Sequence, residues 1–121
     1  MARVTLDHLV KVYGTNRVVD DVSLTVEQGE LVALLGPSGC GKTTTLRMIA
    51  GFVEATSGRV LIGDEDVTEL PPYRRNTGMV FQGYALFPHM TVFANVAFGL
   101  EMRKVSKAET ETRVRRALEL V

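Results

Sequence analysis

The chain has 121 residues, enough for one domain, and its 14 basic and 14 acidic residues give a formal net charge of zero. Because neither sign clusters strongly, the charge pattern offers no footprint for nucleic acid, and no nucleic-acid partner is expected. No apolar run approaches the roughly 20 residues that span a bilayer, and the N-terminus lacks the apolar core of a signal peptide. We therefore expect a cytoplasmic chain, and its single cysteine excludes an intramolecular disulfide.

The first 30 residues are predicted to be mainly antiparallel β-structure. Apolar and polar residues alternate over residues 4–13, and a β-rich run resumes over residues 18–26 after a Gly-Thr-Asn turn. The LVALLG run at residues 31–36 is nearly continuously apolar, which predicts a strand buried on both faces of a parallel sheet.

A phosphate-binding pattern, G-x-x-x-x-G-K-[ST], follows this run and precedes a helix predicted over residues 43–50. Glycines and small residues allow a tight turn whose backbone N–H groups point at phosphate oxygens, and the helix dipole adds to their attraction. Lys42 is expected to reach the β and γ phosphates, Thr43 to bind Mg²⁺ and Thr44 to lie near the α phosphate. The predicted phosphate-binding set is Gly36, Pro37, Ser38, Gly39, Cys40, Gly41, Lys42, Thr43 and Thr44. The alternative is a glycine loop without a ligand.

Downstream of the loop, residues 59–68 predict a short hairpin with its turn at Gly63 and Asp64. The string VLIGDE imitates the apolar run ending in Asp-Glu that holds a metal and a general base. Because Gly63 interrupts the run, no catalytic role is assigned to Asp64 or Glu65.

The last third of the chain is predicted to be helical. TGMVFQ at residues 77–82 is a further strand candidate, and Thr91 is expected to cap a helix that runs through Glu101. Ser106 and Glu109 form a capping box ahead of an apolar stripe at helical spacing, made of Val114, Ala117, Leu118 and Val121. The stripe reaches Val121 without a stop signal, so we expect the chain to be a portion of a longer protein.

Several of these features coincide in one family. Tyr13 lies 23 residues before Gly36, the loop reads GPSGCGKTTTLRMIAG, and TSGRVLIGDEDVTELPPYRR and MVFQGYALFPHMTVFANVAFGL follow it. Together these resemble the N-terminal half of the ATP-binding subunit of ABC transporters, of the importer type that serves carbohydrate, polyamine, sulfate or iron permeases. Within this family, the segment PPYRRNTGMVFQGYALFPHMTV resembles polyamine systems slightly more than the others.

The resemblance implies an α/β fold with an incomplete RecA-like phosphate-loop NTPase core. It also implies an antiparallel β subdomain at the N-terminus and the start of a helical subdomain. We expect one partial nucleotide-binding domain over residues 1–121, with mainly antiparallel β-structure in 1–30, the phosphate-loop core and hairpin in 31–82, and the start of the helical subdomain in 83–121.

The resemblance also implies further binding residues. Tyr13 matches the aromatic residue that stacks on adenine, Val18 falls where an apolar side chain flanks the base, and Gln82 matches the glutamine that reaches Mg²⁺ and the attacking water. An aromatic face suits any purine, and an amide oxygen can ligate a metal or accept from water. The alternatives are a core aromatic for Tyr13 and a solvent-facing polar residue for Gln82.

The segment after Gln82 crowds apolar side chains into what is predicted to be a surface loop, which is typical of a partner site. In the resembled family this segment receives a helix of the membrane permease, which implies contacts near Tyr84, Phe87, Pro88, His89 and Met90. The competing interpretation is that Phe87 and Met90 pack under the helix that follows.

The signature motif of LSGGQ type, the acidic Walker B strand and the switch histidine of this family do not occur in the 121 residues. Only Lys42 and Gln82 could support catalysis, so the isolated chain is expected to bind ATP weakly and not to turn it over measurably. The leading interpretation is the ATP-binding portion of a transport ATPase, a homodimer when complete, peripheral on the inner face of the cell membrane. The alternatives are a non-catalytic nucleotide-binding or permease-interaction module, and another phosphate-loop NTPase.

Overall fold

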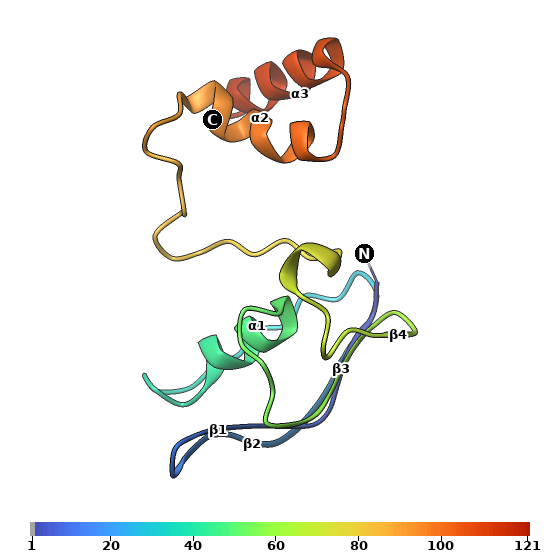
Figure 1. Cartoon of the computed structure of the whole chain (residues 1–121), viewed down its shortest axis with the longest axis vertical. Coiled ribbons are helices and arrows are strands. Elements are labelled where there is room, and N and C mark those ends of the chain that lie inside the picture. Colours follow the sequence, from blue (N-terminus) through green and yellow to red (C-terminus); the bar gives the residue numbers. More distant parts are fainter. Residues whose placement is uncertain (1) are drawn as a thin grey trace. The chain divides into compact units, whose positions relative to one another are not determined.

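The computed structural model describes residues 2–121, which divide into two compact units with the boundary between Met79 and Val80. The first unit contains the strands and the first helix, and the second contains the last two helices (Figure 1).

The first unit is built on a four-stranded sheet. Its strands are β1 (Val4–Tyr13), β2 (Asn16–Val26), β3 (Ser57–Ile62) and β4 (Glu65–Asp66), in the spatial order β2-β1-β3-β4 and antiparallel throughout. Both predicted hairpins are confirmed, with β4 following the turn at residues 63–64. The pairing of β1 with β3 joins segments about 50 residues apart and was not expected from local pattern.

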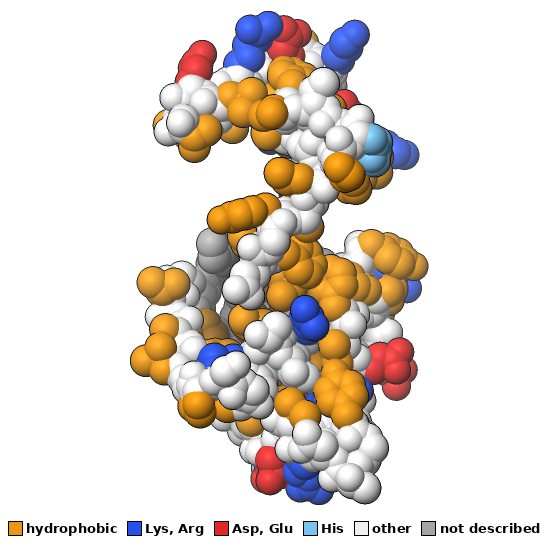
Figure 2. Space-filling model, turned by 90° about the vertical axis from the view of Figure 1, so that its left-hand side faces the viewer, with side chains coloured by type: hydrophobic (Ala, Val, Ile, Leu, Met, Phe, Trp, Pro, Cys, Tyr) orange, Lys and Arg blue, Asp and Glu red, His pale blue; other side chains and the backbone are white. Residues whose placement is uncertain are grey.

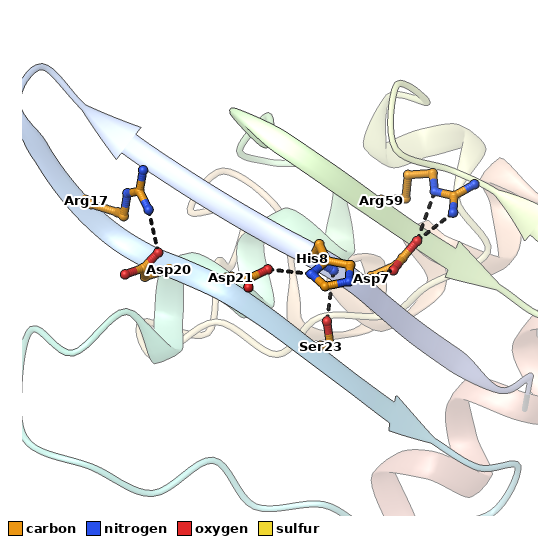
Figure 3. A network of polar contacts seen from close by, with 7 residues as sticks. All are labelled: Asp7, His8, Arg17, Asp20, Asp21, Ser23 and Arg59. Carbon is orange, nitrogen blue, oxygen red and sulfur yellow. Dashed lines mark hydrogen bonds and ion pairs between the residues drawn. The ribbon is translucent and has the colours of Figure 1, made fainter.

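A polar network lies across β1, β2 and β3 (Figure 3). His8 and Asp21 both have left-handed backbones, with φ of 50° and 51°, where the pairing of β1 with β2 shifts register. The His8 Nδ1 atom lies 2.6 Å from an Asp21 carboxylate oxygen, and Arg59 of β3 donates to Asp7 at 2.6 Å. The hydrogen bond to Asp21 is the largest cause that raises the pKa of His8.

Helix α1 (Lys42–Ala50) lies over one face of this sheet (Figure 1). The predicted helix is confirmed, and its end at Gly51 follows the rule for glycine caps: Gly51 is left-handed and donates to the carbonyls of Arg47 and Met48. Met48 packs into a core otherwise supplied by the sheet and the segment after it, made of Leu6, Leu9, Val19, Val60 and Val67.

The two strands predicted at residues 31–36 and 77–82 are wrong, because neither segment has regular secondary structure. Leu31, Leu35 and Val80 are at least 90% exposed, and apolar side chains cover much of the visible surface of the first unit (Figure 2). A strand exists only through ladder hydrogen bonds to a neighbour, and a fully apolar strand also needs cover on both faces. Within residues 2–121 the strands pair only in the antiparallel sheet, which leaves both runs without a neighbour.

The second unit is a pair of helices, α2 (Val92–Met102) and α3 (Lys107–Glu119). Both predicted caps are confirmed: the Thr91 hydroxyl accepts from Ala94 N–H at 3.1 Å, and the Ser106 hydroxyl accepts from Glu109 N–H at 3.4 Å.

The packing between these helices uses only part of the predicted apolar stripe of α3. Val114 is fully buried and Leu118 half-buried, whereas Ala117 and Val121 are exposed. The Glu109 carboxylate accepts from Arg113, so only one half of the expected capping box forms. None of the helices in residues 2–121 is long and apolar enough to cross a membrane.

Candidate functional site

A pocket of about 260 Å³ opens at the N-terminus of α1. It is lined by Tyr13 at the end of β1, by Val18 of β2, and by Gly39, Cys40, Gly41, Lys42, Thr43 and Thr44. The β1–β2 hairpin and the glycine loop thus meet around one space, and most of the predicted nucleotide-binding residues lie together there.

Gly41 is the residue that brings the loop against β2. Its φ is 90°, and a Cβ atom added to it would lie 2.4 Å from the carbonyl oxygen of Val18. Only glycine therefore allows this approach at this conformation. As the N-cap of α1, Gly41 supplies no side-chain hydrogen bond, so N–H groups of the first helical turn stay available for an anion.

Lys42 places its charge within the loop. Its ammonium donates to the carbonyl oxygens of Gly36 at 2.8 Å and Pro37 at 2.6 Å, and lies 3.3 Å from the sulfur of Cys40. Gly36 and Pro37 contact Lys42 but do not line the pocket, and Ser38, exposed in the turn of the loop, does not line it either. Because phosphate oxygens are stronger acceptors for an ammonium than neutral carbonyls, Lys42 can exchange these contacts for a triphosphate.

Tyr13 offers an aromatic surface at the mouth of the pocket, with 49% of its area exposed. The ammonium of Lys11 lies 4.9 Å from the centre of its ring and also donates to the Glu54 carbonyl at 2.6 Å. One face of the ring is thus held by a cation, which leaves the other face for stacking on a base. Sequence reasoning missed Lys11, although its place two residues before Tyr13 on a strand puts both side chains on one face.

Gln82 is not among the residues that line this pocket. It is an exposed residue of the second unit, within a run of turns that precedes α2. In residues 2–121 no group of three or more His, Cys, Asp or Glu side chains is arranged to hold a metal ion.

The loop before α2 is organised by Asn95, a residue that sequence reasoning also missed. Its side-chain oxygen accepts from Phe87 N–H at 2.8 Å, and its amide nitrogen donates to the carbonyls of Phe87, Met90 and Thr91 at 3.0 to 3.3 Å. The ring of Phe87 packs against that of Phe98, with centroids 4.7 Å apart. An asparagine four residues after a capping threonine is the signal that could have suggested this arrangement.

The same loop still presents apolar surface. Tyr84 is 77% and Leu86 68% exposed, while Phe87 keeps 36% of its area accessible despite its contact with the helix. Phe87 thus packs against the helix that follows, as the competing interpretation expected, and keeps part of its area accessible.

Comparison with known proteins places this chain in a family. The family model described as ABC transporter matches residues 19–121. The chain is 57% identical to the spermidine/putrescine import ATP-binding protein PotA of Thermobifida fusca (strain YX) over an alignment of 122 residues. The alignment covers 98% of this chain and 32% of that protein. The Fe(3+) ions import ATP-binding protein FbpC of Brucella abortus (strain 2308) is 55% identical over 118 residues, with 98% and 33% covered.

A solved structure shows the same fold. The ATP-binding cassette MJ0796, in a dimeric post-hydrolysis state bound to ADP and Pi, superposes with a TM-score of 0.84 at 30% identity, covering 96% of this chain and 56% of that one. The chain spans about a third of the length of the curated relatives it matches. The predicted fold class, a partial phosphate-loop NTPase with an antiparallel sheet at its N-terminus, is confirmed. Because the family model matches most of the chain, this chain belongs to the ABC transporter family.

Proposed function

We propose that this chain is the ATP-binding portion of an ATPase subunit that energises solute import through a membrane permease. The observation that carries the proposal is the pocket that joins Tyr13 to Lys42 and Thr43, because it offers a base-stacking surface and a phosphate site within one space. PotA and FbpC are both named as import ATP-binding proteins, which supports the proposal that ATP drives transport here.

The residues of the pocket have separate tasks in this proposal. Tyr13 stacks on adenine, Val18 flanks the base, and the loop N–H groups hold the phosphates. Lys42 neutralises charge on the β and γ phosphates, and Thr44 lies near the α phosphate.

The Thr43 hydroxyl lines the pocket and suits Mg²⁺ bound with the nucleotide. Mg²⁺ prefers oxygen ligands and is commonly held by few protein groups together with substrate phosphates, so no acidic cluster is required. On the family resemblance we propose the amide oxygen of Gln82 as a further ligand. When bound, the ion supplies charge stabilisation to the phosphates. Gln82 would also orient the attacking water through the same amide.

We propose polyamines as the class of imported solute, because the chain is 57% identical to PotA. The 55% identity to an iron importer shows that this portion of the subunit carries little cargo information. This agrees with a motor that never touches the solute. We further propose that the complete subunit is a homodimer, which the dimeric structure of the MJ0796 neighbour supports. We also propose that it lies peripherally on the inner face of the cell membrane.

Cys40 provides the test of nucleotide binding, because it is the only cysteine, is exposed and lines the pocket. MgATP should slow the labelling of Cys40 by a maleimide, and Lys42→Met should remove most of this protection. No protection of the natural chain at millimolar MgATP would refute the proposal. Phosphate release from the 121-residue chain that depends on Lys42 would instead contradict the expectation of binding without turnover.

The permease contact is proposed for the loop with Tyr84, Phe87, Pro88, His89 and Met90. Its support is the exposed apolar surface described above. Tyr84→Ser should weaken co-purification of the complete subunit with its permease. Tyr73→Ser is the matched control, because Tyr73 is 87% exposed and belongs to the first unit. Equal co-purification of both variants would contradict this contact.

A further inference from the structure

Arg75 is a buried arginine whose hydrogen bonds within residues 2–121 all go to backbone carbonyls. It is 5% exposed and follows the short 3₁₀ helix η1 (Pro72–Arg74). Its guanidinium donates to the carbonyls of Met48 at 2.6 Å, Ile49 at 3.0 Å, Leu70 at 2.7 Å and Thr68 at 2.8 Å. A buried charge requires compensation, and here four carbonyl dipoles in direct contact supply it together with the more distant charge of Asp66.

Two of these carbonyls, those of Met48 and Ile49, belong to the last turn of α1. Carbonyls there have no partner within the helix, and a cation at this end also interacts favourably with the helix dipole. The chain makes room for the group at Gly51, because a Cβ atom there would lie 2.7 Å from the Arg75 Nε atom. Burial lowers the pKa of Arg75, yet arginine stays protonated at neutral pH.

Helix α1 is therefore held at both ends. At its start Gly41 rests against the Val18 carbonyl, and at its end Arg75 ties the last turn to the segment that follows β4. The helix has nine residues and is thus about 13 Å long, with Met48 as its largest buried side chain. Because Lys42 and Thr43 form its first turn, the direction of the helix decides where their side chains lie.

We propose that Arg75 is a positioning residue of the phosphate site: it fixes the C-terminal end of α1 and thereby the position from which Lys42 and Thr43 meet a triphosphate. This inference rests on the proposed nucleotide-binding function. A lysine would keep the charge but not the planar fork that reaches carbonyls from several directions, so Arg75→Lys is not conservative here.

The test separates positioning from simple stability. The variants are Arg75→Met, Arg75→Ala, Arg75→Lys and Gly51→Ala. The control is Ile62→Ala, because Ile62 is a half-buried residue of β3 that packs against the same core but makes none of these contacts. All are measured at a low temperature at which circular dichroism shows them folded. The readout is the MgATP concentration that halves the rate of Cys40 labelling.

Arg75→Met and Gly51→Ala should raise this concentration about tenfold or more, because the charge-assisted hydrogen bonds that hold phosphates weaken steeply when their donors move out of line. Ile62→Ala should lower the melting temperature and leave the ATP midpoint unchanged. Millimolar guanidinium, but not the same concentration of sodium chloride, should restore part of the affinity of Arg75→Ala by filling the vacated site.

The possible failures are distinguishable. If the natural chain shows no protection by MgATP, the proposed function fails and this inference falls with it. If the natural chain is protected, and Arg75→Met and Gly51→Ala lose melting temperature but keep the natural ATP midpoint, Arg75 only stabilises the fold and the inference alone is wrong. Should Arg75→Met not fold, Gly51→Ala and Arg75→Lys decide in the same way.

Discussion

The contact between Gly41 and the Val18 carbonyl can be tested with a pair of alanine substitutions. Gly39 and Gly41 both have left-handed backbones, with φ of 82° and 90°. They differ in surroundings: nothing lies within 4 Å of a Cβ added to Gly39, whereas a Cβ on Gly41 would lie 2.4 Å from the Val18 oxygen. Gly39→Ala thus adds backbone strain alone, and Gly41→Ala adds the same strain plus a clash.

The magnitudes follow from these two terms. A left-handed backbone costs an alanine about 1–2 kcal/mol, which is the whole expected loss for Gly39→Ala. Forcing extra atoms into a packed site costs about 1–3 kcal/mol more. The Val18 carbonyl cannot move aside freely, because the residues on either side of Val18 pair with β1. Gly41→Ala should therefore lose about 2–5 kcal/mol in total, a large part of the roughly 5–15 kcal/mol of a typical domain.

The assay is urea unfolding followed by tyrosine fluorescence in a Tyr84→Phe background. The chain has three tyrosines, and this substitution leaves Tyr13 and Tyr73, both in the first unit, as reporters. Gly41→Ala should unfold at clearly lower urea than Gly39→Ala, with equal slopes. Equal losses in the two variants would refute the argument that the Val18 carbonyl dictates glycine at position 41.

Three further predictions concern other features. The ion pair of His8 with Asp21 stabilises the fold fully at pH values below about 6.5, the pKa of an unfolded histidine. This contribution is lost as the pH rises through the raised pKa of His8 in the folded state. Asp21→Asn should therefore cost more stability at about pH 5.5 than at about pH 9 in urea titrations. The Thr110 hydroxyl is buried with no hydrogen-bond partner among residues 2–121, so Thr110→Val should stabilise the helical unit by about 1 kcal/mol in thermal unfolding. Asn95→Leu removes the hydrogen bonds of the Asn95 side chain to the loop before α2, so the same measurement should show a loss of about 1–2 kcal/mol.

Each of these has a control. A pH-independent cost of Asp21→Asn would show that the charge of His8 contributes nothing. Thr110→Ser is the control, because it keeps the hydroxyl and removes the methyl group. A Thr110→Val variant that is no more stable than Thr110→Ser would contradict the claim that the hydroxyl is buried without a partner among residues 2–121. Asn95→Asp keeps the acceptor for Phe87 N–H, so it should cost less than Asn95→Leu; the reverse order would contradict the assigned hydrogen bonds.

Much of the fold and of the site was predictable because its causes are local. A glycine loop followed by helix formers, the cap residues Thr91 and Ser106, and the turn at Gly63 and Asp64 act within a few residues of where they stand, and the structure confirms each of them. The ABC transporter family could likewise be inferred from strings of neighbouring residues.

Features that depend on distant partners could not be predicted in this way. The apolar runs at residues 31–36 and 77–82 look like strands, but a strand forms only beside another, and the sheet of residues 2–121 pairs β1 with β3 instead. Nothing in the local sequence distinguishes Arg75 from Arg74 beside it, and only the carbonyls of α1 and of residues 68 and 70 show why Arg75 is buried. Composition and local pattern determined the phosphate loop, the hairpins and the helix caps. Tertiary structure alone decided which segments meet around the loop, because those contacts join residues tens of positions apart.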